Sequence, residues 1–295
     1  MKGNALVELR PHDTGRRPGL AHKARRVGMN PNHWYPAAFS REVKKGKVIE
    51  TRFSGEDLAV YRGADGIAQV VENRCPHRHI KLSHGSVENC NLVCIYHGWT
   101  FDRTGELVEM KHDDFGKKLP SVRIRSYETR ERYGIVWFFP GDQALARVTP
   151  LVEVPNYEGP GAWGSLSFAF TWGAHHSMII DNLCNLTHVW VHGKWLPYAD
   201  TVLADHTHEG DKITLTWKHQ LRRDYQYPLS RRLFGKNGGS ESDTYMVYDY
   251  PYQSALSNGR VRSSNFMLPL DDTHTKVFSI QQWQPARIPF AKNRH

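Results

Sequence analysis

Two pairs of cysteine and histidine constrain this chain more than any other feature of its sequence. Cys75 stands two residues before His77, and a second pair follows after sixteen residues. In that second pair Cys94 stands three residues before His97. Thiolates and imidazoles spaced so closely are typical of metal sites. Each pair occupies one short loop, so a shared site requires a fold in which the two loops face each other.

Two thiolates and two imidazoles match the ligand set of a Rieske-type [2Fe–2S] cluster, in which one iron has two sulfur ligands and the other has two nitrogen ligands. Each pair would then give one ligand to each iron. Zinc is an alternative, but zinc ligand pairs usually follow C-x-x-C or H-x-x-x-H spacing. Coincidence is another, because the chain has 17 histidines. The two ordered pairs favour the cluster, with His79 and His84 as surface or supporting groups.

The length of 295 residues suits two domains. No apolar run reaches the roughly eighteen residues of a membrane-spanning helix. The first residues are basic but lack the apolar segment of a signal peptide, so we expect a cytoplasmic protein. Besides Cys75 and Cys94 the chain has only Cys90 and Cys184. We expect these two to be buried thiols without a disulfide.

The net charge of +9 is spread along the chain. No helix-turn-helix, zinc-finger or RNA-binding pattern accompanies it, so neither nucleic acid nor a membrane is the expected partner. A basic iron–sulfur protein suits an acidic electron carrier best, because opposite charges steer the two proteins together.

The first half of the chain predicts an all-β domain over residues 32–145, after a polar arm over residues 1–31. Short strand-like runs alternate there with turn signals. The predicted strands are Val48–Phe53, Leu58–Arg62, Ile67–Glu72, Trp99–Asp102, Leu107–Met110, Ser121–Tyr127 and Tyr133–Phe139. Residues 141–163 are rich in proline and glycine and are interpreted as a linker or domain boundary.

The second half, residues 146–295, predicts one helix and several strands. A stretch without proline or glycine predicts a helix over Ala174–Val191. The predicted strands are Ser165–Thr171, Lys212–Lys218, Tyr245–Tyr250, Val261–Leu268 and Thr275–Trp283, with a basic loop from Arg222 to Ser242. The fold class is therefore α+β, an all-β domain followed by an antiparallel sheet with helices.

Two histidines on the predicted helix suggest a second metal site. His188 and His192 are four residues apart, so a helix places them on one face, one turn apart. Two histidines and a carboxylate form the facial triad that holds Fe(II) in many oxygenases. The alternative is an ordinary amphipathic helix whose histidines make polar contacts. The cluster motif upstream favours iron.

The sequence resembles the Rieske ring-hydroxylating oxygenases, in particular the carbazole-dioxygenase type. The resemblance rests on the two Cys/His pairs, on the flanking Arg78 and Gly98-Trp99, and on the stretch Asn32–Ser40, and it covers residues 32–200 well. It implies a terminal oxygenase whose [2Fe–2S] cluster passes electrons to a mononuclear iron in a helix-grip catalytic domain. It also implies a ferredoxin or flavin reductase as electron donor, O₂ and a small apolar substrate, and a homotrimer in which one subunit's cluster serves the next subunit's iron.

Two positions depart from that family's pattern. The residue three before the first iron histidine is usually an Asp that bridges to a neighbour's cluster histidine, and here it is Asn185. An amide forms hydrogen bonds but carries no charge, and Asp181 is the candidate substitute. The third iron ligand of the family is an acidic residue near the C-terminus, and none follows Asp272. We therefore expect a C-terminally incomplete chain, recruitment of Asp205, Glu209 or Asp272, or a defective iron site.

The leading interpretation is an oxygenase that uses O₂ and electrons from NAD(P)H to hydroxylate or demethylate a small aromatic or alicyclic compound. Two alternatives remain: a Rieske electron-transfer protein, and a non-catalytic oxygenase subunit without a working mononuclear iron. Three irons per chain would support the oxygenase, and two would support either alternative. The substrate is not identified, since Trp172, Met178, Trp190 and Phe266 are equally candidates for core and for pocket.

Overall fold

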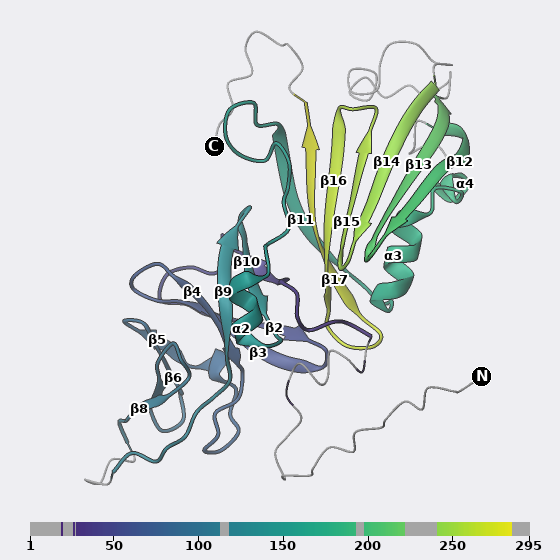
Figure 1. Cartoon of the computed structure of the whole chain (residues 1–295). Helices are drawn as coiled ribbons and strands as arrows, with labels where there is room; N and C mark the ends of the chain where they lie inside the picture. The colour runs from purple at the N-terminus through teal and green to yellow at the C-terminus, as the bar shows by residue number, and fades with distance from the viewer. Residues whose placement is uncertain are drawn as a thin grey trace, which may run out of the picture.

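Three antiparallel sheets form the part of the chain that the structure describes (Figure 1). The computed structural model describes residues 19 and 26 and the ranges 28–112, 118–192, 198–221 and 241–284. Within these residues no helix has the length and apolar character needed to cross a bilayer. Most of the predicted arm over residues 1–31 and of the predicted loop from Arg222 onward lies outside the described residues.

The first sheet is built around strands that are buried along their whole length. In spatial order it contains β1 (Tyr35–Phe39), β10 (Ile135–Phe139), β9 (Ser126–Arg132), β4 (Ala68–Glu72), β3 (Glu56–Arg62) and β2 (Val48–Phe53). β1 and β10 have no exposed residue, and β10 consists of β-branched and aromatic side chains that suit a sheet interior. The predicted strand over Ser121–Tyr127 was placed too early, because the ladder with β10 begins only at Glu128 and β9 itself at Ser126.

The second sheet is small and carries the two ligand loops. It contains β5 (Ser86–Glu88), β6 (Asn91–Val93), β7 (Trp99–Phe101) and β8 (Leu107–Met110), and the short 3₁₀ helix η1 (Leu82–His84) precedes it. The first ligand loop follows β4 and the second connects β6 to β7. A compact apolar cluster lies beneath both loops, including Leu82, Leu92 and Phe101, so the loops rest on a fixed base.

A short helix interrupts the predicted linker over residues 141–163. α2 (Gln143–Val148) begins after Asp142, whose Oδ1 accepts a hydrogen bond of 2.9 Å from the backbone N–H of Ala144. An Asp in this position is a standard N-cap, and its signal was present in the sequence. The predicted linker or domain boundary therefore contains one short helix.

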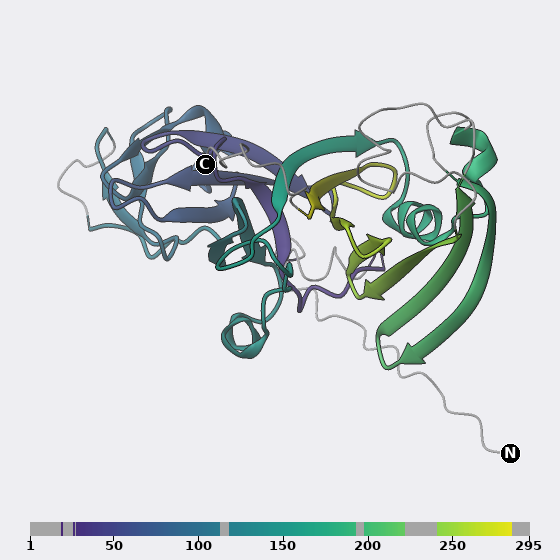
Figure 2. The same ribbon diagram turned by 90° about the horizontal axis from the view of Figure 1, so that it is seen from above.

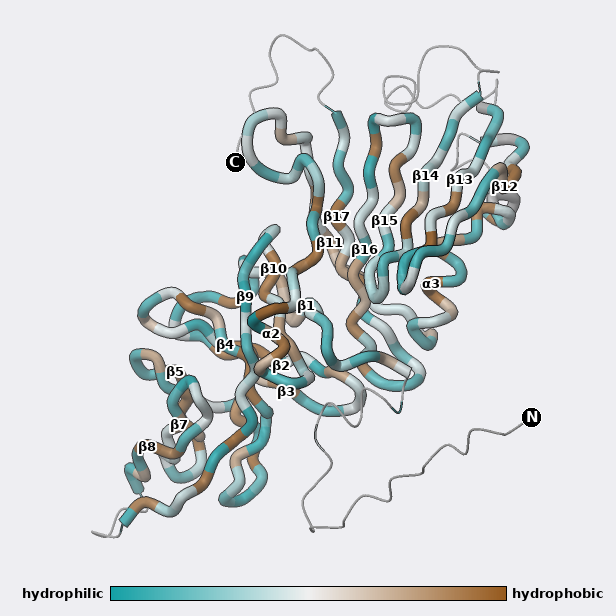
Figure 3. The backbone as a smooth tube through the Cα atoms, in the orientation of Figure 1, coloured by the Kyte–Doolittle hydropathy of each residue, from teal (hydrophilic) through white to brown (hydrophobic). Residues whose placement is uncertain are grey.

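The third sheet forms the second half of the chain. In spatial order it contains β11 (Gly164–Trp172), β17 (Thr275–Trp283), β16 (Val261–Pro269), β15 (Tyr252–Ser257), β14 (Glu241–Asp249), β13 (Lys212–Leu221) and β12 (Tyr198–Glu209). Figure 3 shows hydrophobic and hydrophilic residues mixed along its strands. The prediction of an all-β domain followed by an antiparallel sheet with helices is confirmed.

The predicted single helix over Ala174–Val191 is in fact two helices, α3 (His176–Cys184) and α4 (Val189–His192). The break lies at Asn185, whose φ of −103° and ψ of 112° are extended. Its side-chain Oδ1 accepts hydrogen bonds from the backbone N–H and the hydroxyl of Thr187, at 2.8 and 2.6 Å. Asparagine competes with the helix in this way by binding the backbone two residues ahead.

The two faces of the seven-stranded sheet meet different parts of the molecule. One face packs on the six-stranded sheet, with ring centroids 4.9 Å apart for Trp137 and Phe266 and 5.1 Å for Phe39 and Phe278. The other face carries α3, which contacts β15 and β16. Figure 2 shows α3 inside the curve of this sheet. Because one hydrophobic core runs through both domains, their relative position is fixed by packing.

Candidate metal centres

The two ligand loops close with the same backbone pattern. In the first, the N–H of Cys75 donates to the carbonyl of Ile80, and the N–H of His79 donates to the carbonyl of Cys75, both at 2.9 Å. In the second, Cys94 pairs in the same way with Trp99 at 2.9 Å and with Gly98 at 3.1 Å. The loops are thus equivalent in shape, and only the position of the histidine differs between them.

The residue four after each cysteine has a left-handed backbone. His79 has a φ of 60° and Gly98 a φ of 66°. A Cβ on Gly98 would also lie 2.8 Å from the Cβ of Lys111. The second loop therefore requires glycine at this position, whereas the first loop tolerates the cost of a histidine.

We expect Gly98→Ala to destabilise the second loop by about 2 kcal/mol, because backbone strain and the close approach of Lys111 act together. The variant should lose its iron faster than the wild type during thermal unfolding followed by visible absorption. His79→Gly is the matched control, since it relieves the same left-handed strain, and it should unfold at the wild-type temperature or above. Equal stability of Gly98→Ala and the wild type would contradict this account.

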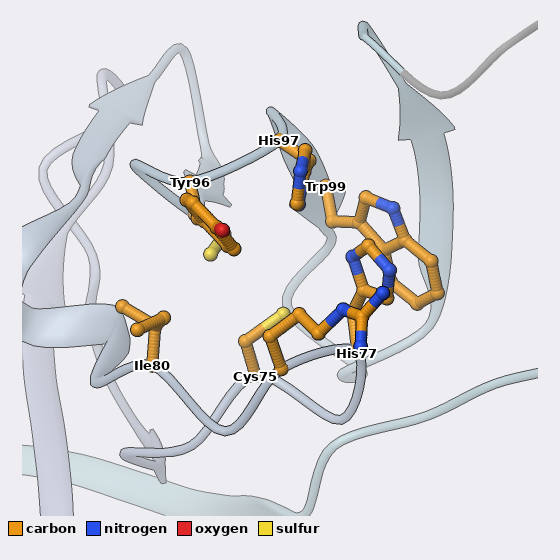
Figure 4. A pocket seen from close by; sticks show the side chains of 8 residues that line it. Cys75, His77, Ile80, Tyr96, His97 and Trp99 are labelled. Carbon is orange, nitrogen blue, oxygen red and sulfur yellow. The ribbon is translucent and has the colours of Figure 1, made fainter.

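The four predicted cluster ligands surround one small pocket. Figure 4 shows Cys75, His77 and His97 directed toward a common space bounded by Ile80 and Tyr96. The rings of His77 and His97 have centroids 4.7 Å apart. Cys94 lines the same pocket. The structure therefore brings together every residue of the two pairs.

The two thiols are close enough to share a proton. A hydrogen bond from the Cys75 thiol lowers the pKa of Cys94 to about 6, and the same bond raises the pKa of Cys75. Backbone N–H groups of Tyr96 and His97 also stabilise a thiolate at Cys94. The sulfur side of the pocket is thus arranged for anionic ligands, as an iron–sulfur cluster requires.

The nitrogen side of the pocket also fits a cluster. Nδ1 of His97 is buried and has no hydrogen-bond partner among the residues that the structure describes. An unsatisfied buried nitrogen is costly unless it binds something, and an iron ion would satisfy it. Trp99 stacks on His77 with centroids 4.6 Å apart and an interplanar angle of 8°, which fixes the orientation of that imidazole. The residues present therefore match a [2Fe–2S] cluster with two sulfur and two nitrogen ligands.

The side chains on the outer wall of this pocket are exposed to solvent. Tyr96 is 56% exposed and lies 4.0 Å from His97 between ring centroids. Ile95 is 66% exposed beside it. Both cluster histidines are half-buried, so their imidazoles lie near the surface.

The second pair of histidines lies at the far end of the seven-stranded sheet. His188 comes just before α4 and His192 is its last residue, with ring centroids 5.1 Å apart. Within the described ranges no third His, Cys, Asp or Glu side chain joins His188 and His192 in a group that could hold a metal ion. Asp205, Glu209 and Asp272 therefore do not complete this pair.

The predicted bridging residues share a surface hollow with the first iron histidine. Asp181, Asn185 and His188 line it, together with Ser177, Met178 and Asn182. The carbonyl of Asp181 accepts the N–H of Asn185 at 3.1 Å. The Oδ1 of Asn185 is occupied by Thr187, so the side-chain NH₂ is its remaining polar group.

Of the four residues left open between core and pocket, Phe266 belongs to the core, with 1% of its surface exposed. Met178 is 66% exposed on α3, Trp172 is half-buried, and the side chain of Trp190 lies outside what the structure describes. Cys90 and Cys184 are free thiols, but both are half-buried and not buried as predicted.

A buried row of polar side chains under α3 was not identified from the sequence. Nδ2 of Asn265 donates to Oε1 of Gln253 at 2.6 Å, and the hydroxyl of Ser279 donates to Oδ1 of Asn265 at 2.8 Å. These residues stand directly opposite one another on three strands. Each looks like an ordinary polar strand residue until the strand register is known.

Comparison with known families matches both halves of the chain. The Rieske [2Fe-2S] domain matches residues 33–124, and the vanillate O-demethylase oxygenase C-terminal domain matches residues 172–289. The 4beta-methylsterol monooxygenase of Methylococcus capsulatus is 36% identical over 271 residues, which are 90% of this chain and 72% of that protein. The phthalate 4,5-dioxygenase oxygenase subunit of Pseudomonas putida is 28% identical, over 88% of this chain and 61% of its own length.

Solved structures share the fold. Dicamba monooxygenase bound to dicamba has a TM-score of 0.69 at 21% identity, covering 86% of this chain and 78% of its own. The terminal oxygenase of carbazole 1,9a-dioxygenase from Nocardioides aromaticivorans IC177 has a TM-score of 0.63 at 20% identity, covering 91% and 80%. The two domains therefore occur in the same order and arrangement in these proteins.

Proposed function

This chain belongs to the family of Rieske non-haem iron oxygenases, and on that premise we propose that it is the terminal oxygenase component of such a system. It would use O₂ and electrons from NAD(P)H, delivered by a ferredoxin or flavin reductase. The observation that supports this most directly is the presence of both ligand sets in one chain. Cys75, His77, Cys94 and His97 share one pocket, and His188 and His192 are paired beside the catalytic sheet.

When bound, the cluster would supply single electrons and the mononuclear iron would supply open coordination positions for O₂ chemistry. The chain's own residues hold and tune these groups. Cys75 and Cys94 give anionic sulfur, Trp99 orients the imidazole of His77, and His188 and His192 hold the second metal.

The two centres lie at opposite ends of the molecule (Figure 1). The ligand loops belong to the small four-stranded sheet, and α4 lies beside β12 at the outer edge of the seven-stranded sheet. Transfer between subunits is therefore part of the proposal, in a homotrimer where the exposed imidazole side of one chain docks near Asn185 and His188 of the next.

The substrate that we propose is alicyclic and steroid-like, hydroxylated or demethylated by the enzyme. The relative that is 36% identical over most of this chain is named a sterol monooxygenase. The alternative is an aromatic substrate. It is supported by the phthalate 4,5-dioxygenase oxygenase subunit, which is less similar to this chain, at 28% identity. Two further candidates are an electron-transfer protein and a non-catalytic subunit, and the absence of a third ligand beside His188 in the described residues is the observation that favours them.

Iron counting tests the proposal. The purified full chain should bind three irons and two acid-labile sulfides, and it should consume O₂ only when substrate, reductase and NAD(P)H are all present. Two irons per chain with no substrate-dependent O₂ uptake would overturn the oxygenase assignment and support electron transfer or a non-catalytic role.

The amide at position 185 gives a prediction about electron transfer between subunits. A carboxylate can accept the same two hydrogen bonds from Thr187, so Asn185→Asp keeps the local turn. It also adds a charge that stabilises a cationic imidazole on the neighbouring subunit. We expect single-turnover electron transfer to stay equal or to rise by up to about tenfold. Asn185→Ala, which loses both bonds, is the comparison, and a large loss of rate in Asn185→Asp would contradict the bridging assignment.

Charge steering gives a prediction about the electron carrier. The chain has a net charge of +9, and Arg78 is exposed at the edge of the cluster pocket. Turnover with an acidic ferredoxin should fall severalfold as ionic strength rises from about 0.02 to about 0.5 M. Electron transfer from the neutral reductant dithiothreitol or a small mediator serves as the control and should change little. A rate with ferredoxin that does not respond to salt would exclude an acidic carrier.

A further inference from the structure

Four polar side chains on the outer strands of the seven-stranded sheet, three of them buried and one half-buried, serve no role in the function described so far. Thr201, His219 and Ser242 stand directly opposite one another on β12, β13 and β14. Trp217 lies two residues before His219, on the same face of β13. We call these four residues the strand patch.

Every member of the strand patch has a polar atom without a partner. Oγ1 of Thr201, Nε1 of Trp217, Nδ1 of His219 and Oγ of Ser242 are buried and make no hydrogen bond within the described residues. Trp217, His219 and Ser242 are only 4%, 2% and 3% exposed. Buried polar groups are almost always satisfied in folded proteins, so four unsatisfied atoms in one place point to a bound group.

The strand patch lies on the face of the sheet that carries α3, and one of its strands contacts α4. His219 and Trp217 share a face with Tyr248, through the unbroken register between β13 and β14. Burial raises the pKa of the Tyr248 phenol, and the thiol of Cys184 on α3 is close enough to contribute to that rise, so this is the face that carries α3. α4, which ends at His192, contacts β12, the strand of Thr201 (Figures 1 and 2).

The chemistry of the strand patch selects a neutral oxygen. The indole nitrogen of Trp217 can only donate a hydrogen bond, so the bound atom must accept one. Nε2 of His219 is engaged with Oγ1 of Thr244 at 2.7 Å, and that hydroxyl lies 3.0 Å from Oγ of Ser257. This chain of hydroxyls lets His219 present its free nitrogen as donor or acceptor.

An anion is a poor fit to the same atoms. Burial lowers the pKa of His219 to about 4, so its imidazole is neutral at pH 7. The strand patch contains no Lys or Arg, and the alternation of β13 directs Lys218 to the opposite face. A carboxylate placed here would be desolvated without a counter-charge, which is strongly unfavourable.

We propose that the strand patch binds a neutral hydroxyl or carbonyl oxygen of an alicyclic substrate and so positions that substrate beside the iron histidines. This inference rests on the proposed oxygenase function and adds to it the polar group by which the substrate is recognised. Trp217, His219, Ser242 and Thr201 are positioning and specificity residues in this proposal.

Binding of four steroid probes to the full chain tests the proposal. The probes are 5α-cholestan-3β-ol, 5α-cholestan-3-one, 5α-cholestane, which lacks oxygen, and cholan-24-oate, which carries a carboxylate without a ring oxygen. Affinities are measured by calorimetry with cyclodextrin as the carrier. The alcohol or the ketone should bind at least about tenfold more tightly than the hydrocarbon, because the hydrocarbon leaves the buried polar atoms unpaired.

Variants of the strand patch test whether these residues cause the preference for oxygenated steroids over the hydrocarbon. His219→Phe and Ser242→Ala should each reduce the affinity ratio between the better-bound oxygenated probe and the hydrocarbon to within about threefold, mainly by weakening the oxygenated probe. Gln220→Leu is the matched control, one residue away on the opposite face, and it should keep the wild-type ratio. If His219→Phe fails to fold by circular dichroism, Ser242→Ala decides the question, since it removes only one hydroxyl.

Several outcomes would overturn the proposal. They are no binding of any steroid, equal affinity for the alcohol, the ketone and the hydrocarbon, tightest binding of cholan-24-oate, and a preference for the oxygenated probe that survives in Ser242→Ala. A crystal structure of the alcohol complex in which only water contacts Nδ1 of His219 would do the same. Iron content and O₂ uptake are measured separately, so three irons with turnover of an aromatic acid would refute this inference and leave the oxygenase function standing.

Discussion

Replacing Cys94 by serine is expected to remove the [2Fe–2S] cluster and to abolish the supply of electrons to the catalytic domain. The Cys94 sulfur is the more acidic of the two thiols and is supported by backbone N–H groups of the second loop. A serine hydroxyl has a much higher pKa than a thiol and is a poor ligand for this iron. The visible absorption and the electron paramagnetic resonance of the reduced cluster should both disappear, and iron content should fall by two per chain.

Cys90→Ser is the control for this experiment. Cys90 is a half-buried free thiol outside the ligand pocket, so its replacement should leave spectrum, iron content and turnover at wild-type values. A Cys94→Ser variant that kept the wild-type spectrum would mean that the cluster is held by other residues. Loss of the spectrum in both variants would indicate a general loss of folding, which circular dichroism would detect.

Replacing His188 or His192 by alanine is expected to stop oxygenation while leaving the cluster intact. Each variant removes one of the two nitrogen ligands, so one iron per chain should be lost and substrate-dependent O₂ uptake should fall by about 10³-fold or more. The absorption of the [2Fe–2S] cluster should not change, because the cluster lies in the other domain. The measurement combines metal analysis, visible spectroscopy and an oxygen electrode.

His208→Ala is the matched control, an exposed histidine on β12 of the same domain. It should retain the wild-type iron content and turnover. If His188→Ala and His192→Ala also retained both, the pair would not be an iron site. The chain would then act as an electron-transfer protein or as a non-catalytic subunit.

The meeting of the two Cys/His pairs in one pocket was predictable because each pair is local. Cys75 and His77 lie on one loop, Cys94 and His97 on another, and the spacing within each loop sets which atoms can reach one site. Strands with clear patterning were predictable for the same reason, and β2, β8 and β17 have the predicted bounds. Such signals depend on a few neighbouring residues and survive any change elsewhere in the chain.

The helix prediction failed where a side chain competed with the backbone. The stretch over Ala174–Val191 has no proline or glycine, yet Asn185 ends α3 by accepting two hydrogen bonds from Thr187. The break changes the position of His188, which now precedes α4. The pair remains together, with ring centroids 5.1 Å apart, although one continuous helix does not hold it.

The sequence alone determined the chemistry of the first centre, the α+β fold class and the pairing of the two later histidines. Only the tertiary structure decided which residues from distant parts of the sequence lie next to one another. It placed Phe266 in the core shared by both domains and Ser242 opposite His219. It also placed the two metal centres at opposite ends of the molecule. The physical reason is that ligand spacing is a property of one loop, whereas strand register and the face of a sheet depend on partners far away in the sequence.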